Sequence, residues 1–212
     1  MFFRPGDHPG TLSHDPFNAI VVPRPIGWIS TRDTQGVANL APYSFFNAVA
    51  YDPPQVMFAA TNSHRHGGQK DSIRNAQETG EFVVNVVTYA LRKQMNASAV
   101  SAPSHINEFE YAGLTEAPSQ IVKAPRVAES PIHLECRYTQ TVDLPTHDPD
   151  HPNTVIFGEV IGIHIDECVI KNGRLDLAAI QPVGRLGYLD YVHITDCFAM
   201  DRPIWPPDAP IH

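Results

Sequence analysis

Hydrophobic and polar residues alternate with a period of two along two long stretches of this chain. Residues 131–142 place one apolar set on a common face: Ile132, Leu134, Cys136 and Tyr138. The opposite face carries a polar set: His133, Glu135, Arg137 and Thr139. This alternation is typical of a half-buried strand. Residues 154–165 alternate in the same way, so the two segments are predicted to be neighbours in an antiparallel sheet.

Shorter elements can be placed around these two strands. Three segments rich in β-branched or aromatic residues are predicted strands: 26–31, 55–60 and 81–87. Helices are few: Asp71 can cap a short helix that runs through Gln77 and stops at Gly80, and residues 89–99 form a second candidate. Residues 144–153 are predicted to be an exposed hairpin loop, and residues 202–212 an extended tail.

Many strands with few helices indicate a barrel-like all-β or β-rich α+β domain. The chain has 212 residues, which fits one large domain. It contains no internal repeat and no convincing boundary between two domains. We therefore expect a single domain over residues 1–212, with a core at about residues 15–195.

Composition excludes several classes of protein. The formal net charge of −8 lacks the electrostatic footprint of a general nucleic-acid binder. Three widely spaced cysteines argue against a disulfide scaffold and suit a reducing cytosol. The first ten residues do not resemble a signal peptide, and the longest charge-free stretch is a poor membrane span. We expect a soluble cytoplasmic protein.

Common catalytic and metal motifs are absent from the sequence. The histidine pairs His64/His66 and His147/His151 lie in polar segments, where solvated loop histidines are a better interpretation than a metal site. No metal and no protein nucleophile are predicted, because no GxSxG occurs and Cys136 alternates with core residues. Nucleotide motifs of the P-loop and Rossmann types are also missing.

Three groups of residues remain as candidates. Lys70 and Ser72 flank the start of the predicted helix, where an ammonium, a hydroxyl and free amides can converge on a phosphate; an ordinary capped helix with an exposed lysine is the alternative. Ser30 and Thr31 end a predicted strand. A small, polar and aromatic cluster surrounds Pro42 and can either contact a flat heteroaromatic ring or pack as a strand edge: Asn39, Ala41, Ser44, Phe45 and Phe46.

Taken in order, these segments resemble the flavin reductase-like family with the FMN-binding split-barrel fold. The first motifs are PRPIGWIST (23–31), GVANLAPYSFFNAV (36–49), DPPQVMFA (52–59), KDSIRN (70–75) and GEFVVNVV (80–87). Later motifs are NEFEYAGL (107–114), PRVAESPIHLEC (125–136), GEVIGIHI (158–165) and PVGRLGYLDY (182–191). Any one motif is weak, but the ordered set is specific and spans nearly the whole chain.

The resemblance implies a split β-barrel with a few short helices, forming a homodimer with FMN near the subunit interface. Ser30 and Thr31 match positions that approach the phosphoribityl chain, and Lys70 and Ser72 match the phosphate-binding pair. The stretch that lines the isoalloxazine ring corresponds to Asn39, Ala41, Ser44 and Phe45. Arg185 and Tyr188 match a patch that completes the site. Two residues depart from the family pattern: Gly27 replaces a frequent alanine, and Tyr188 follows Gly187 where a second glycine is common.

The resemblance also implies a function. An FMN-dependent oxidoreductase that reduces flavin or a small acceptor with NADH or NADPH is expected, with FMN preferred over FAD. Hydride chemistry belongs to flavin N5, so no catalytic side chain is needed. Two alternatives use the same FMN site: an electron carrier between protein partners, and the reductase component of a two-component monooxygenase. The sequence names neither the acceptor nor the nicotinamide donor.

Overall fold

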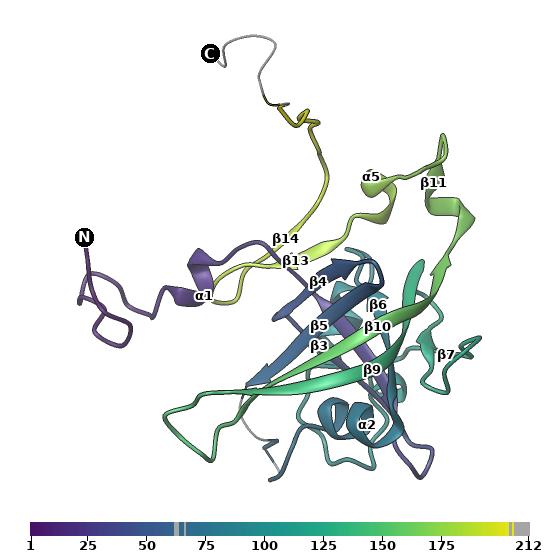
Figure 1. The fold of residues 1–212 in the computed structure, drawn as a ribbon, viewed down its shortest axis with the longest axis horizontal. Coiled ribbons are helices and arrows are strands. Elements are labelled where there is room, and N and C mark those ends of the chain that lie inside the picture. Colours follow the sequence, from purple (N-terminus) through teal and green to yellow (C-terminus); the bar gives the residue numbers. More distant parts are fainter. Residues whose placement is uncertain (62–63, 66, 204, 206–212) are drawn as a thin grey trace.

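The computed structural model describes residues 1–61, 64–65, 67–203 and 205. Seven antiparallel strands form the main sheet in the order β3-β2-β6-β9-β10-β5-β4 (Figure 1). Their bounds are β2 (Gly27–Arg32), β3 (Ala38–Tyr43), β4 (Phe46–Tyr51), β5 (Pro54–Thr61), β6 (Glu81–Val86), β9 (Ile132–Leu144) and β10 (Asn153–Ile165). All five strands predicted from the sequence are present, and β9 and β10 pair along their length as expected.

Smaller elements surround this sheet. The short strands are β1 (Arg24–Pro25), β13 (Val183–Arg185) and β14 (Tyr191–His193) in one sheet, the pair β7 (Glu116–Ala117) and β8 (Arg126–Val127), and the pair β11 (Ile170–Lys171) and β12 (Arg174–Leu175). The helices are α1 (Phe17–Ile20), α2 (Asp71–Thr79), α3 (Arg92–Ala97), α4 (Glu108–Ala112), the 3-10 turn η1 (Glu167–Val169) and α5 (Leu177–Ile180). In the described ranges, no helix has the length and apolar character needed to cross a bilayer.

Connectivity forces the main sheet to curl. β3 and β4 lie at opposite edges of the strand order, yet only Ser44 and Phe45 separate them in the chain. Two residues span only a few ångströms, so the two edges must meet, as in a barrel. The edges are not paired with each other in the sheet, which leaves a seam between them. The expected barrel-like, β-rich fold is therefore confirmed, and it is open along one line.

The barrel interior is filled by aromatic and aliphatic side chains. Phe58 and Phe82 are fully buried and meet edge to face, with ring centroids 5.3 Å apart. Ile73 and Ala76 of α2 join this cluster. Cys136 is also buried there, as the sequence predicts for a small hydrophobe, and burial raises the pKa of its thiol.

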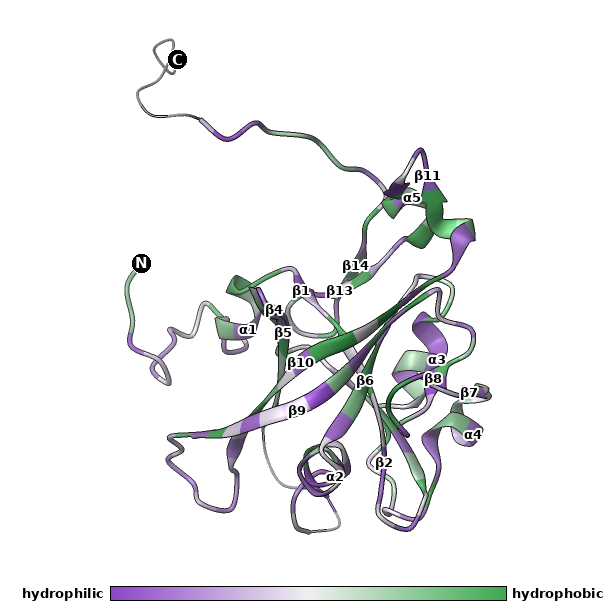
Figure 2. Cartoon of the chain, turned by 45° about the vertical axis from the view of Figure 1, so that its right-hand side comes forward, coloured by the Kyte–Doolittle hydropathy of each residue, from purple (hydrophilic) through white to green (hydrophobic). Residues whose placement is uncertain are grey.

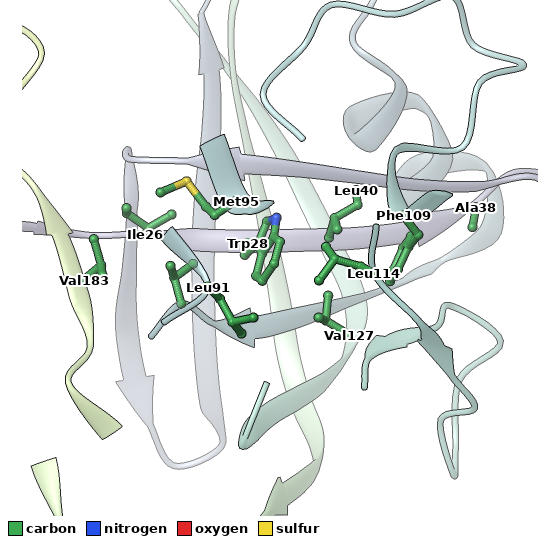
Figure 3. Close-up of a cluster of buried hydrophobic side chains, with 11 residues drawn as sticks. Ile26, Trp28, Ala38, Leu40, Leu91, Met95, Phe109, Leu114, Val127 and Val183 are labelled. Atoms are coloured by element: carbon green, nitrogen blue, oxygen red, sulfur yellow. The ribbon is translucent and has the colours of Figure 1, made fainter. Parts of the chain in front are cut away.

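A second cluster covers the outer face of β2 and β3. Trp28 is fully buried at its centre, and its indole Nε1–H donates to Ser98 Oγ at 2.8 Å. Leu91, Met95 and Phe109, from the α3 and α4 regions, pack around it (Figure 3). Because both faces of β2 are covered, this strand is buried almost throughout.

Helix α2 differs slightly from its prediction. The helix begins at Asp71 itself, and Lys70 occupies the N-cap position without a side-chain cap. Asp71 instead accepts a hydrogen bond from Arg74 at 2.5 Å. The predicted stop is confirmed: Gly80 ends the helix at φ 76°, a left-handed conformation that glycine adopts without strain. The second predicted helix is shorter than residues 89–99, since α3 spans Arg92–Ala97.

The polar face assigned to residues 131–142 requires correction. His133 and Glu135 are buried, because residues 118–130 cover that face of β9. Both Glu135 oxygens accept hydrogen bonds, from the amides of Gln120, Ile121 and Val122 at 2.7–2.9 Å and from His164 Nε2. The ring of His133 hydrogen-bonds through Nε2 to the Val127 carbonyl at 2.8 Å. Alternation alone predicts that His133 and Glu135 face water, but in the folded chain their polar groups hydrogen-bond to other protein segments.

The exposed segments follow their predictions where they are described. The loop between β9 and β10 is hydrophilic and projects from the barrel (Figure 2). Its histidine His151 contacts the exposed Asp148 at 2.7 Å. Residues 202 and 203 of the predicted tail have no regular structure. Most of that tail, like His66, lies outside the described residues.

Candidate functional site

Two adjoining cavities open where β3, its following turn and α2 meet. The smaller, of about 110 Å³, lies between β3, the start of α2 and residues 98–101. The larger, of about 500 Å³, extends past Ser44 and Phe45 to the β1–β13 pair. Pro42, Tyr43 and Lys70 line both cavities, which together we call the seam cleft. Its volume is in the range of small-molecule and cofactor sites.

Most of the site residues predicted from the sequence line this cleft. Four contribute to the smaller cavity: Asn39, Ala41, Lys70 and Ser72. Lys70 recurs in the larger cavity, with four others: Ser44, Phe45, Arg185 and Tyr188. These residues come from β3, the turn after it, the start of α2 and the C-terminal β13 region. The fold therefore brings together segments that are more than 100 residues apart in the chain.

Ser30 and Thr31 are the exceptions. Both residues are fully buried and line neither cavity. Ser30 Oγ donates to the Pro125 carbonyl at 2.5 Å and accepts from Asn85 at 3.0 Å. Thr31 Oγ1 accepts from Asn75 at 3.1 Å. The two hydroxyls connect β2 to β6, to α2 and to the segment around Pro125, and their place beside a phosphoribityl chain stays a prediction.

Asn39 organises the floor of the smaller cavity. Its side-chain amide donates to Glu108 Oε2 at 3.0 Å, and its carbonyl oxygen accepts from Ser72 Oγ at 2.7 Å. The hydrogen of Ser72 is thus already committed, so this nearly buried hydroxyl helps to position the floor. A phosphate would have to draw it away from Asn39.

Burial shifts the acidity of two groups in this floor. It raises the pKa of Tyr43 to about 12, and the neighbouring carboxylates of Asp71 and Glu108 act in the same direction. Burial also raises the pKa of Glu108, although hydrogen bonds from Leu40 and Asn39 oppose the effect. Tyr43 therefore stays neutral at physiological pH and presents a hydroxyl and a ring edge without charge.

Lys70 is the group in the cleft best suited to bind an anion. Its side chain is half-buried, and it makes no hydrogen bond or ion pair with any residue that the structure describes. Desolvation by burial lowers its pKa. The Lys70 carbonyl accepts the amides of Ile73 and Arg74, which fixes the residue at the start of α2, where helix amides favour negative charge. An anion placed here would relieve the cost of burying the ammonium.

The opposite end of the cleft contains two arginines. Arg24 and Arg185 are paired across β1 and β13, and burial together with Arg185 lowers the pKa of Arg24. Arg24 donates to the carbonyls of Asn18, Val21 and Leu186, which fastens the α1 region to the loop after β13. Arg185 donates to the Tyr191 hydroxyl at 2.5 Å and to the Tyr188 carbonyl.

The two departures from the family pattern have structural consequences. Tyr188 has φ 56°, a left-handed conformation that glycine adopts without strain, and its ring lies 5.6 Å from that of His14. Tyr188 thus occupies space that a glycine would leave open. At Gly27, an added Cβ would lie 2.6 Å from Cδ2 of Phe46, so alanine would fit only if Phe46 moved.

Sequence reasoning missed several lining residues. Arg24, Asp71 and Glu108 all stand inside motifs that carried the family resemblance, so motif membership was an available signal for them. Tyr43 also lies in such a motif. His14, Asp15 and Asn18 had no comparable signal, because they precede the first motif and reach the cleft only through the fold of the N-terminal segment.

Comparison with known proteins gives consistent results. Residues 19–182 match the model of the flavin reductase like domain. An uncharacterized protein from Aquifex aeolicus is 40% identical over 174 residues, covering 82% of this chain and 85% of that protein.

Two solved structures extend the comparison. Component B of nitrilotriacetate monooxygenase from Bacillus cereus has a TM-score of 0.85 at 28% identity, covering 94% of this chain and 98% of that one. The 2-nitrobenzoate 2-nitroreductase NbaA from Pseudomonas fluorescens has a TM-score of 0.82 at 28% identity, covering 99% and 100% of the two chains.

Proposed function

The chain belongs to the flavin reductase-like family, and on this premise we propose that it is an FMN-dependent oxidoreductase. In this proposal NADH or NADPH supplies the hydride, and free flavin or another small molecule accepts it. The flavin-binding character of the family and the fold of its structural relatives support the general chemistry. The choice of FMN over FAD goes further and rests on the cleft itself, whereas the nicotinamide donor rests on the family resemblance alone.

The observation that carries the proposal is the Lys70 ammonium, which has no partner among the described residues. A half-buried cation without a partner in the described part of the chain is costly, and a phosphate dianion beside it would recover that cost. FMN ends in such a dianion, whereas in FAD the corresponding phosphate is joined to AMP by a phosphoanhydride bond and is no longer a terminal dianion. FMN is therefore expected to bind better than FAD.

The rest of the cleft fits a planar ring beside that phosphate. Ala41 and Pro42 are small or rigid, and Phe45 adds an apolar surface close to the larger cavity. When bound, flavin would itself accept and donate hydride, so the protein needs only to bind, orient and shield it. Asn39 and Ser72 fix the floor, and neutral Tyr43 contributes no charge to the site.

A second candidate function deserves the same test. The chain is similar to component B of nitrilotriacetate monooxygenase. As the reductase component of a two-component monooxygenase, it would deliver reduced flavin to a separate enzyme. An electron carrier between proteins is a third option that uses the same FMN site. A reductase of either kind consumes NADH or NADPH by itself, whereas a carrier does not.

The first experiment is an absorption spectrum of the purified protein, followed by titration with FMN and with FAD. We expect a bound flavin spectrum and tighter binding of FMN. The FMN-loaded protein is then mixed with NADH or NADPH under air, with and without added free FMN. Oxidation of either donor supports a reductase; silence with both donors indicates a carrier. If the protein binds neither FMN nor FAD, the whole proposal is contradicted.

We also propose that the protein is a homodimer. Residues 47–51 of the edge strand β4 are all exposed, including Val49 at 47% and Tyr51 at 92%. An open edge strand with exposed apolar side chains is usually covered by a partner. Sedimentation analysis should detect a dimer when FMN is bound. A stable monomer that retains FMN would contradict this expectation.

A cytoplasmic location fits the same proposal. Cys136, Cys168 and Cys197 are all free thiols, and two of them are exposed. Exposed free thiols persist most readily in a reducing compartment. Fractionation of cells that express the protein would test this.

A further inference from the structure

A second concave surface lies between α3 and the strand β14. It has a volume of about 580 Å³, and its principal lining residues are Tyr89, Arg92, Lys93, Met95, Tyr191 and His193. None of its lining residues lines the seam cleft. We call it the α3–β14 cleft. The flavin-binding proposal above gives it no role.

The floor of this cleft is preformed. Met95 and Val183 line it, and both belong to the buried cluster around Trp28 (Figure 3). A close-packed cluster holds its side chains in fixed positions. A ligand would therefore meet an apolar surface that needs little ordering on binding, which favours affinity.

The walls of the cleft are aromatic. The rings of Tyr89 and His193 meet edge to face with centroids 4.1 Å apart. Tyr89 remains 39% exposed and Tyr191 40% exposed. Exposed aromatic side chains that surround a cavity provide stacking surfaces for a planar ring.

Two cations stand beside these rings. The Arg92 guanidinium lies 3.9 Å from the centroid of the Tyr89 ring and donates one hydrogen bond, to the Tyr89 carbonyl at 2.7 Å. Lys93 is exposed. Neither cation forms an ion pair within the residues that the structure describes, and no acidic side chain is among the described residues that line the cleft. In a chain with a net charge of −8, this is a local excess of positive charge.

We propose that the α3–β14 cleft binds a small aromatic anion, meaning a planar ring that carries a phosphate or a carboxylate. The ring would stack against the tyrosines and the Arg92 plane, and the anionic group would pair with Arg92 and Lys93. Arginine suits this role because its guanidinium both stacks on rings and pairs with planar anions. The apolar floor and the unpaired cations together select such a ligand over a neutral ring or an inorganic ion.

The experiment measures binding of four probes to the FMN-loaded full-length protein by calorimetry. AMP and benzoate each combine a ring with an anion, adenosine provides the ring alone, and inorganic phosphate the anion alone. The Lys70→Ala protein is measured in parallel without added FMN. Probe binding that persists in this variant depends neither on capture of phosphate by Lys70 nor on bound flavin. We expect AMP or benzoate to bind at least about tenfold more tightly than adenosine and phosphate. The tighter of the two is the preferred probe for the variants below.

A matched pair of variants tests the location. Arg92→Gln/Lys93→Gln should weaken binding of the preferred probe by about tenfold or more and leave FMN affinity unchanged. Lys171→Gln/Arg174→Gln removes the same charge from the exposed β11–β12 hairpin and should leave both affinities unchanged. Thermal melting checks that both variants are folded.

Three results would overturn the proposal. Equal binding of adenosine and AMP would mean that the cations play no part. Unchanged binding in Arg92→Gln/Lys93→Gln would place the ligand elsewhere. If no probe binds and the same variant converts a dimer to a monomer in sedimentation, the cleft is an interface between two copies of the chain.

Discussion

Replacing Lys70 with alanine is expected to weaken FMN binding by roughly tenfold to a hundredfold. The substitution removes a charge-assisted hydrogen bond to a phosphate dianion, and such bonds contribute about 1.5–3 kcal/mol. Each 1.4 kcal/mol corresponds to about a tenfold change in affinity. Fluorescence titration of the purified protein with FMN measures the effect directly.

Riboflavin provides the internal control, because it lacks the phosphate. Its affinity should be nearly the same in Lys70→Ala and in the parent protein. Lys171→Ala, an exposed lysine on the β11–β12 hairpin, should bind both flavins like the parent. If Lys70→Ala binds FMN as tightly as the parent does, Lys70 is only a helix-start residue and the phosphate lies elsewhere.

The physical state of Lys70 also predicts the stability of this variant. Burial lowers the pKa of Lys70, which means that the folded protein without ligand disfavours its charged form. Alanine removes that unfavourable term, so the ligand-free variant should melt no lower than the parent. Equal loss of FMN and riboflavin binding together with a lower melting temperature would instead indicate damage to the fold.

The second large effect concerns Glu135. Glu135→Ala is expected to lower the free energy of unfolding by roughly 3–5 kcal/mol, because three loop amides and the ring of His164 lose a buried acceptor. Chemical denaturation monitored by circular dichroism measures this loss. Glu159→Ala is the matched control. The Glu159 side chain is 34% exposed and its carboxylate lies 3.7 Å from Arg137 in a weak surface pair, so the effect should stay within about 0.5 kcal/mol.

The dependence on pH gives a second signature of Glu135. Burial alone would raise its pKa, but the hydrogen bonds from His164 and the three amides outweigh burial and lower the pKa to about 2. The contribution of Glu135 is therefore complete above the ordinary glutamate pKa and is lost as the pH falls towards 2. The parent should lose stability through this acidic range, and Glu135→Ala should lose less. An identical slope in both proteins would contradict the assignment.

Local patterns in the sequence determined most of the secondary structure. Alternation places Ile132 and Cys136 on the same face of β9 whatever packs against the strand, because successive side chains of a strand point to opposite sides. Gly80 ends α2 because a left-handed residue is needed there, and glycine meets that need at little cost. The motifs also contained most of the seam cleft, since Lys70, Asn39 and Arg185 are recognisable by residue type and order.

Tertiary structure alone decided what covers each face and which polar groups remain free. Alternation predicts that Glu135 is exposed, yet residues 118–125 fold over it. In the same segment, the Pro125 carbonyl accepts a hydrogen bond from the Ser30 hydroxyl. The seam exists because a two-residue turn joins the two edges of the sheet, a fact that depends on strand order and not on any local pattern. Sequence periodicity predicts the face of a strand on which a side chain lies. The group that this side chain contacts depends on segments far apart in the chain. That is why Lys70 was predictable as a candidate, and why only the folded chain shows that its ammonium has no partner among the residues that the structure describes.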